Sequence, residues 1–319
     1  MSGYVVRRVA SLVPMWLGIA LLAFALQGLI PGDPARIILE RRTGEAVSDQ
    51  EVRALREQLG LDDPLPLRFG RWVAGAATGD LGSSYSTGQP VLRALAGRFL
   101  VSLQIAVPAL LVGLLIALPA GVASAVRRNA PVDHLSRLGA LIGASVPSFW
   151  LAYLLIIVFS VGLRLLPVAG RGSWQHLVLP AVTLGVGAAA GLMRLTRASM
   201  LEVLGDDFVR TARAKGLPGR RIIFRHALKN ALIPVVTLAA VRFGSLLGAA
   251  AIVETVFGWP GIGKLVVDAI YDRDYPTIQG FLVFIGTVFL LVNLAVDLMY
   301  VWLDPRVRLG AAVERSGAR

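Results

Sequence analysis

The chain of 319 residues contains no cysteine and only three histidines, and charged residues make up 16% of it. The absence of cysteine excludes disulfides, thiolate metal sites and cysteine nucleophiles. His134, His176 and His226 fall in three separate segments, which argues against a histidine metal cluster. Soluble domains carry about 25% charged residues. Together with a hydrophobic content of 55%, the low charge content indicates a protein that crosses a membrane several times.

Six apolar segments are long enough to cross a bilayer, which requires about 20 residues. They cover 9–30, 99–126, 138–163, 174–193, 231–257 and 277–303. We therefore predict an all-α membrane protein with six transmembrane helices. The first segment follows two arginines and contains Ala-x-Ala at 23–25, a pattern that is also typical of a cleaved signal peptide. Its apolar run is longer than a signal-peptide core, so we favour a retained span.

Basic residues lie mainly on one side of these spans. If both termini are inside, the inner segments (1–8, 127–137, 194–230 and 304–319) hold 18 Lys and Arg against 6 acidic residues. The outer segments (31–98, 164–173 and 258–276) hold 13 against 12. Since basic residues concentrate in cytoplasmic loops, we predict that both termini are cytoplasmic.

This topology divides the chain into four parts. A tail and the first span occupy 1–30, a small extracytoplasmic helical subdomain 31–98, the membrane core 99–303 and a cytoplasmic tail 304–319. In the subdomain, Ser48 and Glu51 predict a capping box, and Gly60 predicts the end of that helix. A second helix is predicted over 65–77. Its apolar stripe suits either a helix lying in the membrane interface or a lid packed on the bundle.

The largest cytoplasmic segment contains a strongly basic stretch, residues 210–234, which we call the basic elbow. Leu217, Pro218 and Gly219 interrupt its helical pattern, so we predict a helix, a turn and a second helix. The chain then returns to the membrane directly. A solvated loop is the simpler alternative, but the length and the pattern favour a surface that docks onto a partner.

Three charged residues fall within the predicted spans: Arg242, Glu254 and Asp297. A charge near mid-membrane is costly, so Arg242 is expected to face a partner or a watery cavity. Asp297 is its nearest candidate partner by estimated depth. Wild-type transport by an Arg242→Met variant would contradict a role for Arg242. Glu254 lies near the outer end of its span, and we expect it to reach water.

Two pairs of glycines have the small-xxx-small spacing that lets helices pack closely: Gly187 with Gly191, and Gly244 with Gly248. They predict tight helix packing within the bundle; a subunit interface or a surface that moves is the alternative.

Residues 258–264 nearly match a phosphate-binding P-loop, but Leu265 replaces the hydroxyl residue that the motif requires. ATP hydrolysis is therefore assigned to other chains.

The ordered set of motifs in this chain resembles a known family. The chain is similar to permease subunits of ABC importers, and within them to the B-type subunit of the peptide/nickel (dipeptide and oligopeptide) branch. The resemblance covers nearly the whole chain. The matching motifs are Pro31–Ala35, Leu59–Asp62, Gly79–Gly82, RTARAKGL (210–217), HALKNALIP (226–234), VFGWPGIGKL (256–265), Arg273–Pro276 and Asp304–Arg306.

The resemblance implies a cytoplasmic coupling loop at 199–232. Within it, the stretch around Ala212, Lys215, Gly216 and Leu217 would insert into a cleft of an ATP-binding subunit. Gly216 matches the glycine of the family pattern, whereas Arg210-Thr211-Ala212 stands where the family has Glu-Ala-Ala. The implied coupling residues are Arg210, Thr211, Ala212, Arg213, Ala214, Lys215, Gly216, Leu217, Arg220 and Arg225.

The resemblance also implies the partners and the location. A second homologous permease subunit, two ATP-binding subunits, an extracytoplasmic solute-binding protein and membrane lipid are expected, and no nucleic acid. The chain is expected to be a multi-pass protein of the bacterial plasma (inner) membrane. It would bind no cofactor and carry no catalytic residue, since ATP and Mg²⁺ belong to the partner subunits.

Two questions of function stay open at this point. Di- and oligopeptides are the leading cargo by resemblance, but nickel chelates or other solutes share the branch. A self-contained secondary transporter driven by an ion gradient, with Arg242, Glu254 and Asp297 as its relay, is the rival class. The small number of intramembrane charges and the lack of an evident inverted repeat argue against it. An intramembrane enzyme would need an acid–base pair or a metal constellation, and none is apparent.

Overall fold

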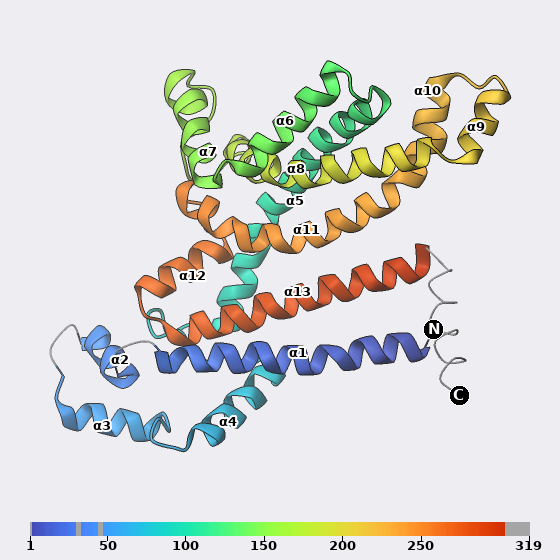
Figure 1. Ribbon diagram of the computed structural model, residues 1–319. Coiled ribbons are helices and arrows are strands. Elements are labelled where there is room, and N and C mark those ends of the chain that lie inside the picture. The colour runs from blue at the N-terminus through green and yellow to red at the C-terminus, as the bar shows by residue number, and fades with distance from the viewer. Residues whose placement is uncertain (1, 30–32, 44–46, 304–319) are drawn as a thin grey trace. The chain divides into compact units, whose positions relative to one another are not determined.

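The computed structural model describes residues 2–29, 33–43 and 47–303, and these are almost entirely helical (Figure 1). No β-strand occurs in this part of the chain; Ser83 and Pro90 form an isolated bridge. The predicted all-α fold is confirmed. The predicted tail at 304–319 and the motif Asp304–Arg306 lie outside the described residues, as do Pro31 and Gly32.

The chain forms two compact units. The first combines Met1–Leu100 with Lys264–Leu294, and the second combines Val101–Gly263 with Ala295–Arg319. The segment Lys264–Leu294 thus belongs to the same unit as the N-terminal residues.

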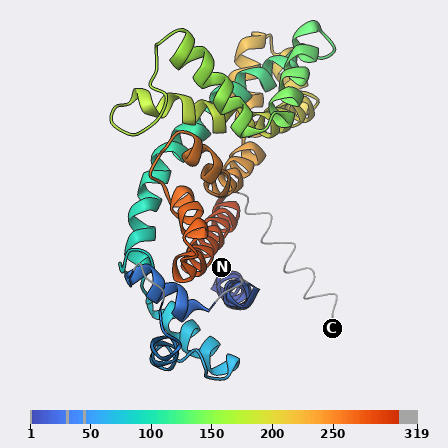
Figure 2. The ribbon, with the colours of Figure 1, turned by 90° about the vertical axis from the view of Figure 1, so that its left-hand side faces the viewer.

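In the first unit, two long apolar helices run side by side (Figures 1 and 2). They are α1 (Ser2–Leu29) and α13 (Tyr275–Leu303). The indole Nε1 of Trp16 on α1 donates a hydrogen bond of 3.0 Å to Thr287 Oγ1 on α13. Because an indole N–H buried in an apolar setting needs an acceptor, this bond fixes the contact between the two helices.

Three short helices follow α1: α2 (Pro34–Thr43), α3 (Asp49–Gln58) and α4 (Leu65–Thr78). The predicted capping box of α3 is present, with Ser48 and Glu51 each accepting a hydrogen bond from the other residue's backbone N–H. The hydrogen bonds from Ser48 also lower the pKa of the Glu51 carboxyl. Gly60 has a φ of +61° directly after the helix, as predicted for a stop.

Helix α4 uses its aromatic residues to contact α1. The ring of Phe69 lies 5.4 Å from that of Phe24, in an edge-to-face arrangement, and Trp72 lies 6.1 Å from the same ring. These contacts favour the lid alternative for this helix, since its aromatic stripe packs on a span.

One of the family-like motifs supplies a buried carboxylate in the first unit. Asp274, from the motif Arg273–Pro276, is 2% exposed and accepts hydrogen bonds from three hydroxyls and one backbone N–H. The donors are Ser84 Oγ, Tyr85 N, Ser86 Oγ and Thr277 Oγ1. Burial, and secondarily the charge of Asp274, raises the pKa of the Tyr85 phenol to about 12. The motif Arg273–Pro276 therefore has a structural role at Asp274, because four donors satisfy a buried carboxylate.

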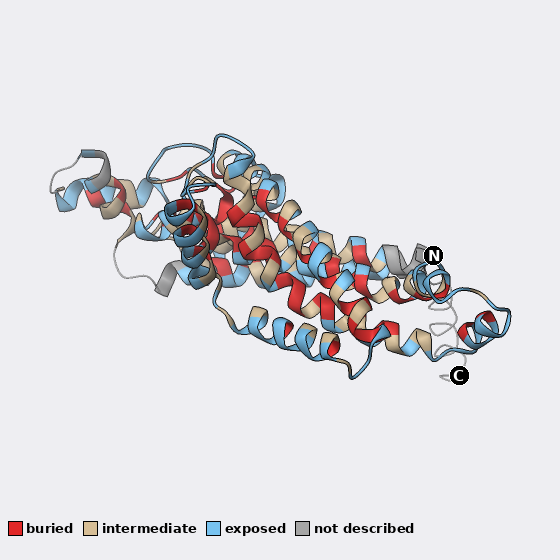
Figure 3. Cartoon of the chain, turned by 90° about the horizontal axis from the view of Figure 1, so that it is seen from above, coloured by how far each residue is buried: buried red, intermediate tan, exposed pale blue. Residues whose placement is uncertain are grey.

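The second unit is built around α8 (Gln175–Leu204), which carries fourteen buried residues. It packs against α11 (Leu228–Val256) and α6 (Pro131–Ser145), and α5 (Val91–Val126) crosses it closely. In Figure 3, buried and exposed positions alternate along the helices. The helix α12 (Ile262–Tyr271) connects this unit back to the first.

Two close helix contacts in this unit depend on glycines that were not predicted. A Cβ at Gly121 of α5 would lie 2.6 Å from Thr196 Cβ, and a Cβ at Gly185 of α8 would lie 2.8 Å from Ala109 O. Nothing lies within 4 Å of such an atom at Gly187 or Gly248. The prediction of tight packing within the bundle is wrong for these two, because a glycine spacing does not reveal which face meets a neighbour.

Among the described residues, five helices are long and apolar enough to cross a membrane, or six if one bent pair counts as a span. The bent pair occupies the predicted third span. It consists of α6 and the helix made of α7 (Ser148–Leu155) and the π-helix η1 (Ile156–Gly162), which meet at 103°. Prolines within the predicted spans, among them Pro147, predict kinks, and the bend confirms the kink in this span. Pro147 forces Val146 into an extended conformation (ψ 122°), and this ends α6.

Candidate functional site

The basic elbow has the predicted helix–turn–helix structure. Its first helix is α9 (Asp207–Ala214), and its second begins with α10 (Gly219–Arg221). The second helix runs through the π-helix η2 (Ile222–Ala227) into α11, so that a continuous helical segment spans Gly219–Val256. The turn is thus joined without a break to a membrane-crossing helix. A force applied at the turn would be transmitted along that helix.

The turn closes α9 with a Schellman motif. Leu217 N donates to Ala212 O at 3.2 Å, and Gly216 N donates to Arg213 O at 2.9 Å. Gly216 adopts a φ of +75°, the left-handed conformation that this cap requires. The motif accounts for the glycine of the family-like pattern in physical terms, since a side chain is disfavoured there.

Gly216→Val should strain this cap, whereas Gly219→Val should not. No atom lies within 4 Å of a Cβ built at either glycine, but only Gly216 has a positive φ. A branched residue in that conformation costs about 1–2 kcal/mol, which lowers the ratio of native to non-native turn by about 5–30-fold. We expect the ATP-driven uptake that the resemblance implies to fall in Gly216→Val only. Equal uptake by the two variants would contradict this assignment.

A small apolar cluster holds the two helices of the elbow together. Val209, Ala212 and Ile222 are buried in it, and Leu217 packs against them. The resemblance implied that Ala212 and Leu217 enter a partner's cleft, but Ala212 is only 8% exposed here. Its side chain therefore supports the turn from inside.

The remaining implied coupling residues are exposed and mostly basic. They are Arg210, Thr211, Arg213, Ala214, Lys215, Gly216, Arg220 and Arg225. Arg210 forms an exposed ion pair of 3.2 Å with Asp207, a kind of pair that contributes little to stability. The surface of the elbow is thus positively charged around a rigid turn.

Two exposed aromatic residues on the elbow were missed by the sequence reasoning. Phe208 is 39% exposed on α9, and Phe224 is 57% exposed on η2. The sequence feature that could have identified them is a large apolar residue within an otherwise basic segment. Because isolated aromatics on a polar surface are enriched at protein interfaces, both are candidates for partner contacts.

Arg242 lies on an exposed face of α11. A Cβ added at Gly191 of α8 would lie 3.2 Å from Arg242 Nη2, so the absence of a side chain at Gly191 makes room for the guanidinium. An arginine exposed on a membrane-length helix fits the expectation that it faces a partner or a watery cavity. Its pairing with Asp297 stays a hypothesis.

Glu254 is fully buried, so the expectation that it reaches water was wrong. Ser102 Oγ donates to Glu254 Oε1, and the same hydroxyl accepts from Ile262 N at 2.8 Å. Trp259 N donates to Glu254 O at 2.8 Å. A Cβ at Gly261 would collide with the carboxylate. The P-loop-like segment is therefore a turn packed around an acidic residue, and no phosphate cradle.

A buried ion pair joins α6 to α8 in the second unit. Asp133 is fully buried and accepts from Arg197 Nε and Nη2, each at 2.8 Å. Ser124 Oγ and Asn129 N donate to the same carboxylate, at 2.6 and 2.9 Å. This pair was not predicted, because both residues were assigned to cytoplasmic segments, where charged side chains are expected to be hydrated.

Comparison with known proteins places this architecture in a family. A family model described as "Binding-protein-dependent transport system inner membrane component" matches residues 117–309, and its N-terminal companion model matches residues 1–106. The chain belongs to this family. The matched region contains the basic elbow and the helices that surround it.

Two curated relatives extend the match to nearly the full length. The glutathione transport system permease protein GsiC of Escherichia coli K12 is 42% identical over 308 residues, which cover 97% of this chain and 99% of the relative. GsiC of Salmonella typhimurium LT2 gives the same figures. The chain is thus a permease subunit of an ABC importer in the peptide/nickel branch, and a multi-pass inner-membrane protein.

A solved structure supports the fold. The inward-facing MetNI methionine ABC transporter has a TM-score of 0.58 to this chain, at 24% identity, and the match covers 68% of this chain and 99% of that one. The helical arrangement is therefore that of an ABC importer permease.

Proposed function

We propose that this permease subunit carries glutathione or other short peptides and is driven through the basic elbow by two separate ATP-binding subunits. The observation that carries the proposal is the continuous helical segment Gly219–Val256, which joins the exposed turn to the membrane. ATP-dependent closure of the partner subunits would displace the turn as a rigid body. The attached helix would then tilt, and the pathway would alternate between outward-facing and inward-facing states.

A second homologous permease subunit completes the pathway in this proposal, and an extracytoplasmic solute-binding protein delivers the cargo. Arg242 supports it, since an exposed arginine at this depth needs a partner helix or a hydrated pathway. The cargo class is supported by relatives that are glutathione transport permeases.

Uptake by the reconstituted complex tests the cargo. Proteoliposomes containing this chain, the permease, ATPase and solute-binding proteins encoded beside it, and ATP should accumulate radiolabelled glutathione or dipeptides. Uptake should stop when ATP is replaced by a non-hydrolysable analogue. Accumulation of a nickel chelate with no peptide uptake would contradict the cargo, and uptake driven by an ion gradient without ATP would contradict the coupling.

The proposed orientation can be tested by thiol labelling, because the native chain has no cysteine and gives no background. With both termini in the cytoplasm, Lys215→Cys in the elbow should be protected from a membrane-impermeant maleimide in spheroplasts. Arg53→Cys on α3 should be labelled; both parent residues are exposed. Permeabilised cells provide the control, since both variants should then react. Labelling of Lys215→Cys in intact spheroplasts would overturn the topology.

A further inference from the structure

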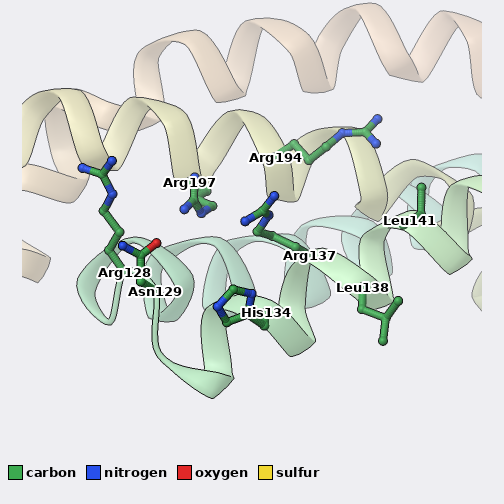
Figure 4. Close-up of a pocket in the computed structure, with 8 residues that line it drawn as sticks. All are labelled: Arg128, Asn129, His134, Arg137, Leu138, Leu141, Arg194 and Arg197. Atoms are coloured by element: carbon green, nitrogen blue, oxygen red, sulfur yellow. The ribbon is translucent and has the colours of Figure 1, made fainter.

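The second unit contains an arginine-lined pocket between α6 and α8 that the transport function does not explain. The pocket has a volume of about 880 Å³. Figure 4 shows the residues around it, which come from α6, α8 and the turn after α5. They are Arg128, Asn129, His134, Arg137, Leu138, Leu141, Arg194 and Arg197.

The charge of this pocket is largely uncompensated. Arg197 is paired with the buried Asp133, which anchors α6 to α8 behind the pocket. Arg128, Arg137 and Arg194 are exposed and have no ion-pair partner among the described residues. Three guanidinium groups that line one pocket repel each other, so an anion bound among them would be stabilised. Guanidinium groups bind phosphate oxygens with paired, charge-assisted hydrogen bonds.

The apolar end of the pocket shows which kind of anion fits. Leu138 and Leu141 are more than half exposed, at 53% and 58%. Leu141 also lines a second, apolar pocket of about 480 Å³, together with Ile142, Val146, Pro147, Phe149 and Trp150. The two pockets share Leu141, and we refer to the apolar one as the groove beyond Leu141. A free phosphate would use the arginines alone, whereas an amphiphile would use both parts.

We propose that this composite site binds an anionic phospholipid, with its phosphate among Arg128, Arg137 and Arg194 and an acyl chain in the groove beyond Leu141. Basic pockets beside apolar helix surfaces bind the anionic headgroups of phospholipids. The site lies on α8, and the C-terminal end of α8 leads to the basic elbow (Figure 1). A bound lipid would therefore brace α6 against α8 next to the coupling elements.

Native mass spectrometry of the assembled, delipidated transporter tests the headgroup. Dioleoyl phosphatidylglycerol is titrated against the wild type, Arg137→Gln/Arg194→Gln and the control Arg127→Gln/Lys229→Gln. Each double variant removes two exposed positive charges, but neither Arg127 nor Lys229 lines the pocket. We expect the pocket double to lose about tenfold or more in affinity, and the control to stay close to the wild type. Restored affinity in Arg137→Lys/Arg194→Lys would show that the pocket variant is still folded.

Further measurements distinguish a bound lipid from free phosphate, from an effect of general surface charge and from an acidic protein partner. Leu141→Gln should weaken phosphatidylglycerol binding without changing the effect of inorganic phosphate as a competitor. Equal losses in the two doubles would overturn the site in favour of general surface charge. Equal affinity for phosphatidylcholine, or binding that phosphate abolishes and Leu141→Gln leaves unchanged, would overturn the lipid. Loss of an ATP-binding subunit in the pocket double, with lipid retention intact, would identify an acidic protein partner and also overturn it.

Discussion

Asp133→Ala is expected to destabilise the assembled permease by about 3–5 kcal/mol, because it leaves Arg197 partly buried without its counter-ion. The carboxylate is fully buried and accepts four hydrogen bonds from Arg197, Ser124 and Asn129. The midpoint of thermal unfolding in detergent should fall by about 6 °C or more. The level of folded protein in the membrane should fall with it.

Asp268→Ala is the matched control for this experiment. Asp268 also pairs with a basic residue, Lys264, at 2.8 Å, but its side chain is 53% exposed. Exposed pairs contribute about 0–1 kcal/mol, so the midpoint should hardly change. The double variant Asp133→Leu/Arg197→Met should recover part of the lost stability, since it removes both charges. Similar midpoints for Asp133→Ala and Asp268→Ala would show that the buried pair has no special role.

Ala212→Glu is expected to abolish coupling while leaving the chain in the membrane. The new carboxylate would replace a methyl group that is buried with Val209 and Ile222. An unpaired charge in such a cluster costs several kcal/mol, so α9 should separate from η2 and the turn should lose its shape. We expect co-purification of the ATP-binding subunits and ATP-driven uptake to fall at least about tenfold, since 1.4 kcal/mol already corresponds to that factor.

Ala198→Glu controls for the added charge. Ala198 is exposed on α8, close to the elbow in sequence but outside its apolar cluster. Both variants should insert equally into the membrane, and Ala198→Glu should keep its ATP-binding subunits. If Ala212→Glu retained them in equal amount, the elbow would not be the coupling element.

The two experiments examine features that differ in how far the sequence revealed them. The elbow was visible because proline and glycine interrupt a basic helical pattern, and its structure follows local rules of helix capping. The ion pair of Asp133 and Arg197 was not visible. Its partners lie 64 positions apart, and which residues meet across that distance depends on how α6 packs on α8.

The same distinction explains the corrections. Hydropathy located the apolar segments, since crossing a bilayer requires length and composition alone. Pro147 predicted a kink in the third span, but the sequence did not reveal that the bend before α7 reaches 103°. For Glu254, the position along its helix gave an approximate depth in the membrane. Its burial depends on Ser102, which donates to the carboxylate, and on the turn at Gly261, which packs against it.

By itself, the sequence determined the class of protein, the long apolar helices, the basic elbow and the family motifs, because each depends on composition or on short-range periodicity. Tertiary structure alone decided which glycines lie at helix crossings, which charges are buried, and that arginines from three segments line one pocket. The physical reason is that burial and charge compensation are properties of packed faces. A face is defined only when a second helix lies against it.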